Sequence, residues 1–195
     1  MAYFLIYQLG MEKQVFLVMG LLLVFVALFL FPWKMLAERW NKGPAYALGL
    51  AIGALAVAAT FLLPAGPTPW VYAIAIVAGI GFSAQWVFPW AMVPDVLELD
   101  RLRTGEHRSG IYYGVWGLTT KLSDALGIAA SGWVLQLYGY VPNVGQSPHT
   151  LLGIRLFFGL VPLLFFALAL PLLIWYPITR QSHAELCRKL EAKGS

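Results

Sequence analysis

Long apolar runs alternate with short polar segments along almost the whole chain. Five of these runs are close to the ~20 residues that a helix needs to cross a ~30 Å hydrocarbon core. A further apolar stretch, residues 2–10, is too short to cross, so we expect it to form the end of a helix and the chain to be a fragment of a longer protein. The predicted transmembrane helices are 15–33, 45–63, 70–93, 111–137 and 151–176.

Composition and charge support this membrane assignment. Hydrophobic residues make up 60% of the chain and charged residues only 11%, outside the range of soluble domains. Basic residues gather after the first, third and fifth runs, in segments 34–42, 101–108 and 180–193. The positive-inside rule therefore predicts a multi-pass protein of the plasma (inner) membrane, with these segments and the C-terminus in the cytoplasm. Residues 179–195 are expected to form a cytoplasmic tail, either a short surface helix or a disordered segment.

Small and aromatic residues predict how the helices pack and where they end. Gly49 with Gly53, and Gly110 with Gly114, have the four-residue spacing that lets helix backbones approach closely. Tryptophan is enriched at membrane interfaces, so Trp33 is interpreted as an anchor at one interface and Trp70 as an anchor at the other.

Motifs of soluble enzymes are missing or accidental. Cys187 is the only cysteine, which excludes an internal disulfide and a cysteine metal cluster, and the three histidines have no ligand spacing. A G-x-G-x-x-A match at 79–84 lies inside a predicted span rather than after a strand, so it does not indicate dinucleotide binding. We expect neither an enzyme nor a metal or nucleic-acid site. No cofactor is expected either.

Two charged residues interrupt the fourth run. Lys121 and Asp124 stand near the middle of the bilayer, where each would cost ~2.5–3.5 kcal/mol if it faced lipid. Tyr113, Thr120 and Ser131 fall on the same broad side of this helix, which is therefore predicted to line a polar cavity. In one interpretation, Lys121 and Asp124 belong to an ion or substrate pathway, as intramembrane charges often do. In the alternative, they form an ion pair that locks two helices together.

Two other groups of residues are candidates for function. Trp86 lies deep in the third run, where its indole could stack on a sugar ring or simply pack between helices. The charged segment 95–110 carries Asp95, Arg101 and Arg108 where the third and fourth runs meet the cytoplasm. This segment is interpreted either as a cytoplasmic gate or as a solvated connector.

Three stretches of the sequence resemble a known family. They are "PWAMVPDVLELDRLRTGEHRSGIYYGVWGLTTKLSDALG" (89–127), "GYVPNVGQSPHTLLGIR" (139–155) and, more weakly, "PWKMLAERWNKGPA" (32–45). The chain resembles the C-terminal half of the glycoside-pentoside-hexuronide:cation symporters of the major facilitator superfamily, which include the melibiose permeases. The resemblance implies the end of helix seven followed by helices eight to twelve. The N-terminal six-helix half would be a missing partner.

The family implies cation-coupled symport of a sugar or glycoside, with Na⁺, H⁺ or Li⁺ as the coupling ion. Lys121 matches a lysine near the cation and sugar site, and Trp86 matches an aromatic residue that faces the sugar. Asp95 matches the start of a cytoplasmic motif, whereas Asp124 departs from the family, whose members usually carry an uncharged residue there. The alternatives are a transporter of lysolipids or other amphiphiles, and a membrane scaffold or accessory subunit that does not transport.

Overall fold

Five long α-helices make up most of the part of the chain that the structure describes. The computed structural model describes residues 2–142 and 144–176, so the predicted tail 179–195 lies outside the described residues. Short helical turns flank the first two long helices, at Phe4–Gln8, Glu12–Gln14 and Thr60–Leu62. The predicted all-α class is confirmed. The long helices are α1 (Val15–Arg39), α2 (Lys42–Ala59), α3 (Trp70–Thr104), α4 (Ser109–Leu137) and α5 (Pro148–Ile174).

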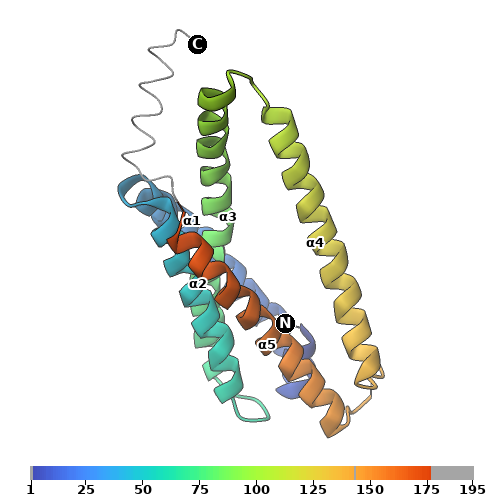
Figure 1. Cartoon of the computed structure of the whole chain (residues 1–195). Helices are drawn as coiled ribbons and strands as arrows, with labels where there is room; N and C mark the ends of the chain where they lie inside the picture. Colours follow the sequence, from blue (N-terminus) through green and yellow to red (C-terminus); the bar gives the residue numbers. More distant parts are fainter. Residues whose placement is uncertain (1, 143, 177–195) are drawn as a thin grey trace.

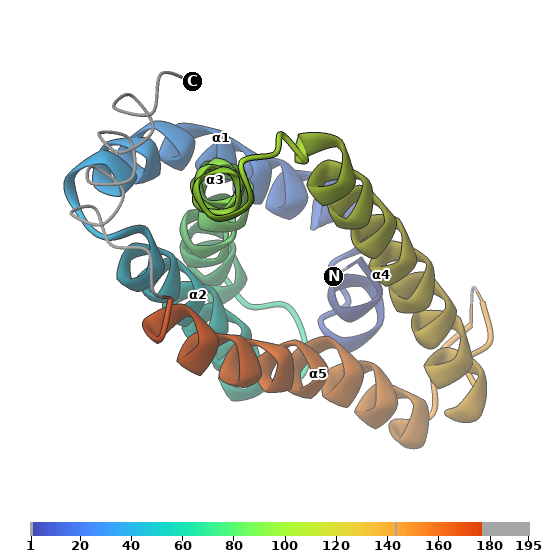
Figure 2. The ribbon, with the colours of Figure 1, turned by 45° about the horizontal axis from the view of Figure 1, so that its top comes forward.

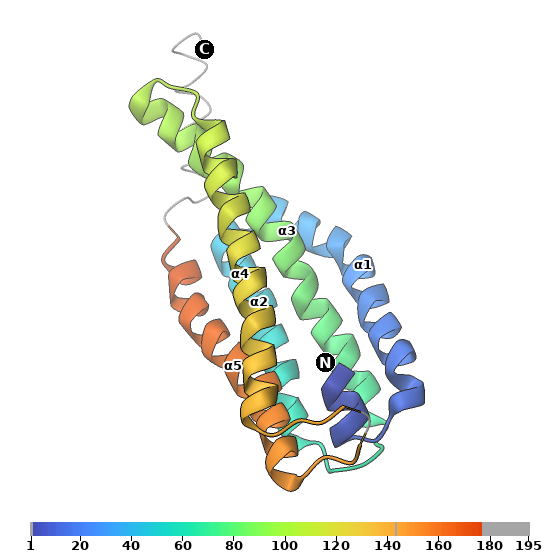
Figure 3. The ribbon, with the colours of Figure 1, turned by 90° about the vertical axis from the view of Figure 1, so that its right-hand side faces the viewer.

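The helices run alternately up and down, as the sequence pattern predicts. The α1–α2 turn, the α3–α4 turn and the end of α5 lie at one end of the bundle, and the loops after α2 and α4 lie at the other (Figures 1 and 3). We call the first of these the basic end, because segments 34–42 and 101–108 lie there.

Helix α3 is the central element, because it packs against both α1 and α2. The contact with α2 is a close approach of backbones: a Cβ atom added to Gly81 would lie 2.3 Å from the backbone nitrogen of Gly53. A Cβ atom on Gly49 would lie 2.2 Å from the Cβ atom of Ala84. The predicted packing role of Gly49 and Gly53 is therefore confirmed. Gly110 and Gly114 have no neighbour within 4 Å of such a Cβ atom, so their predicted packing role does not hold within the described chain.

The interfacial interpretation of Trp33 is wrong. Its side chain is only 5% exposed, and its indole N–H donates a 2.9 Å hydrogen bond to the carbonyl of Ile80 in α3. The ring also meets Phe88 edge-on, with centroids 5.8 Å apart. Because α1 stays in contact with α3 at this level, the indole lies inside the helix pair rather than at its surface. Trp70, at the start of α3, is exposed.

Helix α3 is longer than the sequence pattern suggests. It passes the predicted end at residue 93, continues through Pro94, and reaches Thr104 before Gly105 stops it with a left-handed φ of 75°. Thirty-five residues at 1.5 Å each span ~52 Å, well beyond the ~30 Å hydrocarbon core. The first part of the charged segment 95–110 is therefore a helical extension rather than a loop.

Helix α4 stands apart from the others. It has no buried residue, and among the long helices its main contact is with α5 (Figure 2). Within the described residues, α1, α2, α3 and α5 are long and apolar enough to cross a membrane, but α4 does not meet the same criterion. Its 29 residues would suffice in length, so its polar composition sets it apart.

Candidate functional site

The polar side chains predicted on α4 do share one side of the helix. At 100° per residue, Tyr113, Thr120 and Asp124 fall within about 40° of one another, and Lys121 lies beside them. All four side chains are exposed. Thr120 donates its hydroxyl to the carbonyl of Trp116 at 2.9 Å, one turn earlier, which keeps the side chain against its own helix. We call these four residues the polar face of α4.

Lys121 and Asp124 form no ion pair with each other or with any other described residue. The interpretation as an ion pair that locks two helices together is therefore not realised within the part of the chain that the structure describes. A free ammonium and a free carboxylate one turn apart can serve two chemistries. The ammonium can donate to solute oxygens, and the carboxylate can accept a proton or coordinate a cation.

An apolar cavity of about 450 Å³ lies near the polar face but does not include it. Helix α4 contributes Ser131, Val134 and Leu135 to its wall, and the N-terminal segment contributes Tyr3 and Phe4. Ser131 falls on the same side of α4 as Tyr113, as the helical spacing predicts, and its hydroxyl donates to the carbonyl of Gly127 at 2.7 Å. The cavity wall is therefore suited to hydrocarbon rather than to a hydroxylated ring.

Trp86 is exposed, with 68% of its surface accessible. Because α3 continues to Thr104, Trp86 lies ~27 Å along α3 from the turn, whereas Lys121 lies ~18 Å along α4 from the same turn. A span that ended at Val93, as the sequence pattern predicts, would place the two residues at nearly one level. Measured along the helices they differ by about two turns, and the structure does not bring them together.

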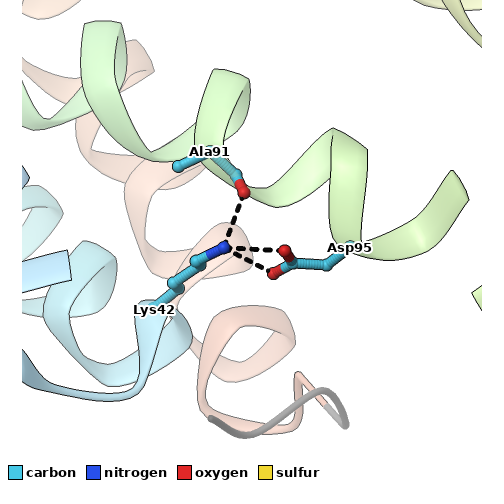
Figure 4. A network of polar contacts seen from close by, with 3 residues as sticks. All are labelled: Lys42, Ala91 and Asp95. Atoms are coloured by element: carbon cyan, nitrogen blue, oxygen red, sulfur yellow. Dashed lines mark hydrogen bonds and ion pairs between the residues drawn. The ribbon is translucent and has the colours of Figure 1, made fainter. Parts of the chain in front are cut away.

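A buried ion pair that the sequence did not reveal joins α2 to α3 at the basic end (Figure 4). Lys42, the first residue of α2, donates to both carboxylate oxygens of Asp95, at 2.7 and 2.8 Å, and to the carbonyl of Ala91 at 2.8 Å. Asp95 is 2% exposed. The sequence did indicate that Lys42 and Asp95 lie at the same end of their predicted helices. We had interpreted Lys42 only as one of the basic residues that set the orientation in the membrane.

The other residues of the predicted gate lie in or beside the α3–α4 turn. Arg108 donates through Nε to Glu106 at 2.7 Å, which raises the pKa of the guanidinium, and both side chains are well exposed. Arg101 belongs to the last turn of α3, where its carbonyl accepts the N–H of Gly105. Asp95 is thus held against α2, while Arg101 and Arg108 lie further along the helical extension and the turn.

Arg155 is a further residue that the sequence analysis did not single out. It lies two turns into α5, donates to the carbonyl of Phe61 and stands 5.8 Å from the centroid of the Phe61 ring. This contact ties α5 to the end of α2 at the end opposite the basic one. Arg155 is therefore occupied by a structural contact.

Known proteins resemble this chain over most of its length. The family model described as MFS/sugar transport protein matches residues 1–180. An uncharacterized symporter of Synechocystis sp. is 33% identical over 99% of the chain. A glucuronide carrier protein homolog of Escherichia coli is 26% identical over 80% of it. The sphingosine-1-phosphate transporter MFSD2B of Xenopus tropicalis is 32% identical over 58% of it.

The matches cover only part of each relative: 37% of the Synechocystis protein, 34% of the Escherichia coli protein and 23% of the Xenopus protein. The chain thus spans about a third of the length of the first two. The relatives are named as transport proteins rather than enzymes, and several apolar helices make the chain a multi-pass membrane protein. The resemblance to melibiose-permease-like symporters is confirmed, and the chain belongs to the MFS/sugar transport protein family of the major facilitator superfamily.

Proposed function

We propose that this chain is the C-terminal part of a cation-coupled symporter that moves a sugar or glycoside by alternating access around a site near the bilayer midplane. The observation that carries the proposal is the polar face of α4. Two charges stand there in mid-helix without a described partner, at a depth where facing lipid would cost ~5–7 kcal/mol for the pair. Such residues usually serve an ion or a solute.

Each residue of the site has a proposed role. Lys121 and Tyr113 donate to the hydroxyl groups of the solute, and Thr120, whose own hydroxyl donates to Trp116, accepts from one of them. Trp86, about two turns away along the helices, offers an apolar ring on which a further part of the solute can stack. Asp124, together with Lys121, responds to the coupling cation, which is Na⁺, H⁺ or Li⁺. Cation and solute then raise each other's affinity to the same extent, because binding linkage is reciprocal.

The proposed partner is an N-terminal six-helix half that covers the polar face of α4. The proposed location is the plasma (inner) membrane, with the basic end and the C-terminus in the cytoplasm. Arg101 and Arg108 then lie at the cytoplasmic mouth, where they act as a gate against the other half, and Asp95 supports this gate from behind by holding α3 to α2. The N-terminal half would supply the remaining ligands of the cation and the solute.

The test is uptake by the longer protein that contains this chain. Labelled glycosides are offered to vesicles under an imposed Na⁺, Li⁺ or proton gradient, with Lys121→Ala compared with Lys34→Ala at the basic end. We expect Lys121→Ala to abolish coupled accumulation and Lys34→Ala to retain it. Accumulation by Lys121→Ala at the wild-type level would refute a role for Lys121 in coupling. If replacement of both Lys121 and Trp86 leaves solute binding unchanged, the result would instead favour the alternative of a membrane scaffold that does not transport.

A second candidate, transport of lysolipids or other amphiphiles, is favoured by the 450 Å³ cavity. Its wall is almost entirely hydrocarbon, with Phe82, Phe157 and Leu135 among its members, and one relative is named as a sphingosine-1-phosphate transporter. Competition between labelled lysolipids and glycosides in the same vesicles separates the two functions. Ala75 lines the cavity, so Ala75→Phe should fill part of it. Loss of lysolipid flux in this variant would support lysolipid transport.

A further inference from the structure

The apolar cavity of about 450 Å³ is bordered by every long helix and by the N-terminal segment. Each helix contributes hydrocarbon to the wall: Leu22 of α1, Val57 of α2, Ala75 of α3, Leu135 of α4 and Phe157 of α5. In another protein an apolar cavity of roughly 150 Å³ already holds benzene. The cavity here therefore has room for an alkyl chain or an aryl group.

The wall of this cavity suits the uncharged, apolar part of a ligand. None of the described residues that line it is charged. Thr60 donates its hydroxyl to the carbonyl of Val57 at 2.6 Å, and Ser131 donates to the carbonyl of Gly127 at 2.7 Å, so neither hydroxyl offers its proton to a ligand. A charged group buried there would lose its hydration without gaining an opposite charge, which is unfavourable.

The cavity lies on the same side of α4 as the polar face. At about 100° per residue, Ser131 points in the direction of Tyr113, five turns earlier, and Val134 and Leu135 of the wall lie within about 60° of Ser131. Asp124 falls within about 20° of the same direction and lies ~10 Å along the helix from Ser131. One elongated molecule can therefore touch the polar face with one end and reach the cavity with the other.

The polar face favours a neutral, hydroxylated group at that end of the molecule. It carries one charge of each sign, on Lys121 and Asp124, and a phosphate drawn to the ammonium would be repelled by the carboxylate one turn away. Sugar hydroxyl groups both donate and accept, so they match both charges at once.

We propose that the solute is a glycoside with a long apolar aglycone, the group that replaces the hydrogen of the anomeric hydroxyl. The sugar ring lies against the polar face of α4, and the aglycone lies in the cavity between Ala75, Leu135 and Phe157. This inference rests on the proposed function, because it names the solute class of the same site. A free sugar has no apolar group that would fill the cavity.

The length of the aglycone sets the expected gain in affinity. The sugar ring and the first carbons of the chain span the ~10 Å between Asp124 and Ser131, so a methyl aglycone does not reach the cavity. Each methylene that leaves water for the cavity lowers the dissociation constant up to about fourfold. We therefore expect an octyl glycoside to bind at least about tenfold more tightly than the methyl form of the same sugar.

The test is competition in vesicles that contain the longer protein with this chain. Uptake of a labelled methyl glycoside is measured against the unlabelled methyl and octyl forms, at concentrations below those at which the octyl form makes micelles. The ratio of the two affinities should fall at least about fourfold in Ala75→Phe, the contribution of one excluded methylene. It should stay at the wild-type value in the matched control Ala73→Phe, which places the same ring at an exposed position of α3.

A second variant acts in the opposite direction. Leu135→Ala enlarges the cavity, so a decyl aglycone should gain on the octyl form relative to the wild type. This variant decides the question if Ala75→Phe does not fold. Octanoyl lysophosphatidylcholine serves as a further competitor and should inhibit at least about tenfold more weakly than the octyl glycoside, because its phosphate meets the carboxylate of Asp124.

The outcomes separate this inference from the proposed function. Equal affinity for the methyl and octyl forms, a ratio unchanged in both cavity variants, or stronger inhibition by the lysolipid than by the octyl glycoside would each overturn the inference. In all three cases, coupled uptake of the methyl glycoside that is lost in Lys121→Ala would still support the proposed symport. If no glycoside is taken up, the proposed function and this inference fall together.

Discussion

Removal of Lys42 should destabilise the bundle more than removal of its partner. Lys42 makes three hydrogen bonds, two of them to Asp95, whose side chain is 3% exposed against 27% for the lysine. Breaking a buried pair by removing one partner costs ~3–5 kcal/mol, because the other charge stays buried and loses the attraction of the charge that was removed. We expect about 3 kcal/mol for Lys42→Met, at the lower end, since water already reaches the lysine side of the pair.

The reverse change is expected to be milder. In Asp95→Leu the ammonium remains, but its 27% exposed side chain can turn toward water, so the expected cost is ~1–2 kcal/mol. The double variant Lys42→Met, Asp95→Leu leaves no buried charge, and apolar replacements of a buried pair are often neutral. Its expected cost is therefore ~1 kcal/mol, mainly the lost bond to the Ala91 carbonyl.

The measurement is reversible unfolding of the whole chain in mixed micelles of increasing SDS fraction, followed by far-UV circular dichroism and tryptophan fluorescence. Coincident transitions by the two probes license the comparison of free energies. The reasoning requires that the double variant be more stable than Lys42→Met alone. Costs that simply add, or a Lys42→Met variant within about 0.5 kcal/mol of the wild type, would show that the pair does not hold α2 to α3.

Two further predictions use the same material. Gly81→Ala should cost ~1–3 kcal/mol in SDS unfolding, because its Cβ atom would lie 2.3 Å from the Gly53 nitrogen, and the matched control Gly114→Ala should be harmless because that Cβ meets open space. An unaffected Gly81→Ala would mean that α2 and α3 are further apart than described. Burial, and then the charge of Asp95, raise the pKa of Tyr176 to about 12 from 10.0. Phenolate absorbance, taken as the difference from Tyr176→Phe, should therefore rise near pH 12 and move lower in Asp95→Asn. A raised pKa means that the stability from Tyr176 is complete below pH 10 and is lost as the pH rises toward 12. A phenolate that forms near pH 10 would contradict this burial.

The positions of the helices could be predicted from the sequence, but their ends could not. Apolar runs of the right length mark α1 to α5 because the bilayer fixes how much hydrocarbon a helix must match. That constraint disappears outside the hydrocarbon core, where α3 continues through Pro94 to Thr104. A proline removes one hydrogen bond without forbidding the next turn, so it is a poor stop signal in a long helix. Gly105, with its left-handed φ, is the actual stop.

The candidate site was predicted as far as it depends on one helix. The polar face of α4 follows from helical periodicity alone, so its residues share a side as expected. Contacts between helices depend on tilt and rotation, which one sequence does not contain. For that reason Trp33 was assigned to an interface instead of the α1–α3 contact, and Lys42 was not matched with Asp95. The level of Trp86 was missed for another reason, because α3 does not end at residue 93 but continues to Thr104.

The helices divide into a tightly packed group and one loosely attached member. Glycine contacts, the Lys42–Asp95 pair and the Arg155–Phe61 contact join α2 to α3 and α5, and α1 packs along α3. A rigid group of this kind is what a rocking movement of one half against the other requires. Helix α4 instead carries Lys121 and Asp124 on its exposed side, and contact of both charges with lipid would cost ~5–7 kcal/mol. A covering surface that solvates both charges would remove most of that cost, so the polarity that sets α4 apart is consistent with the partner half that we propose to bind there.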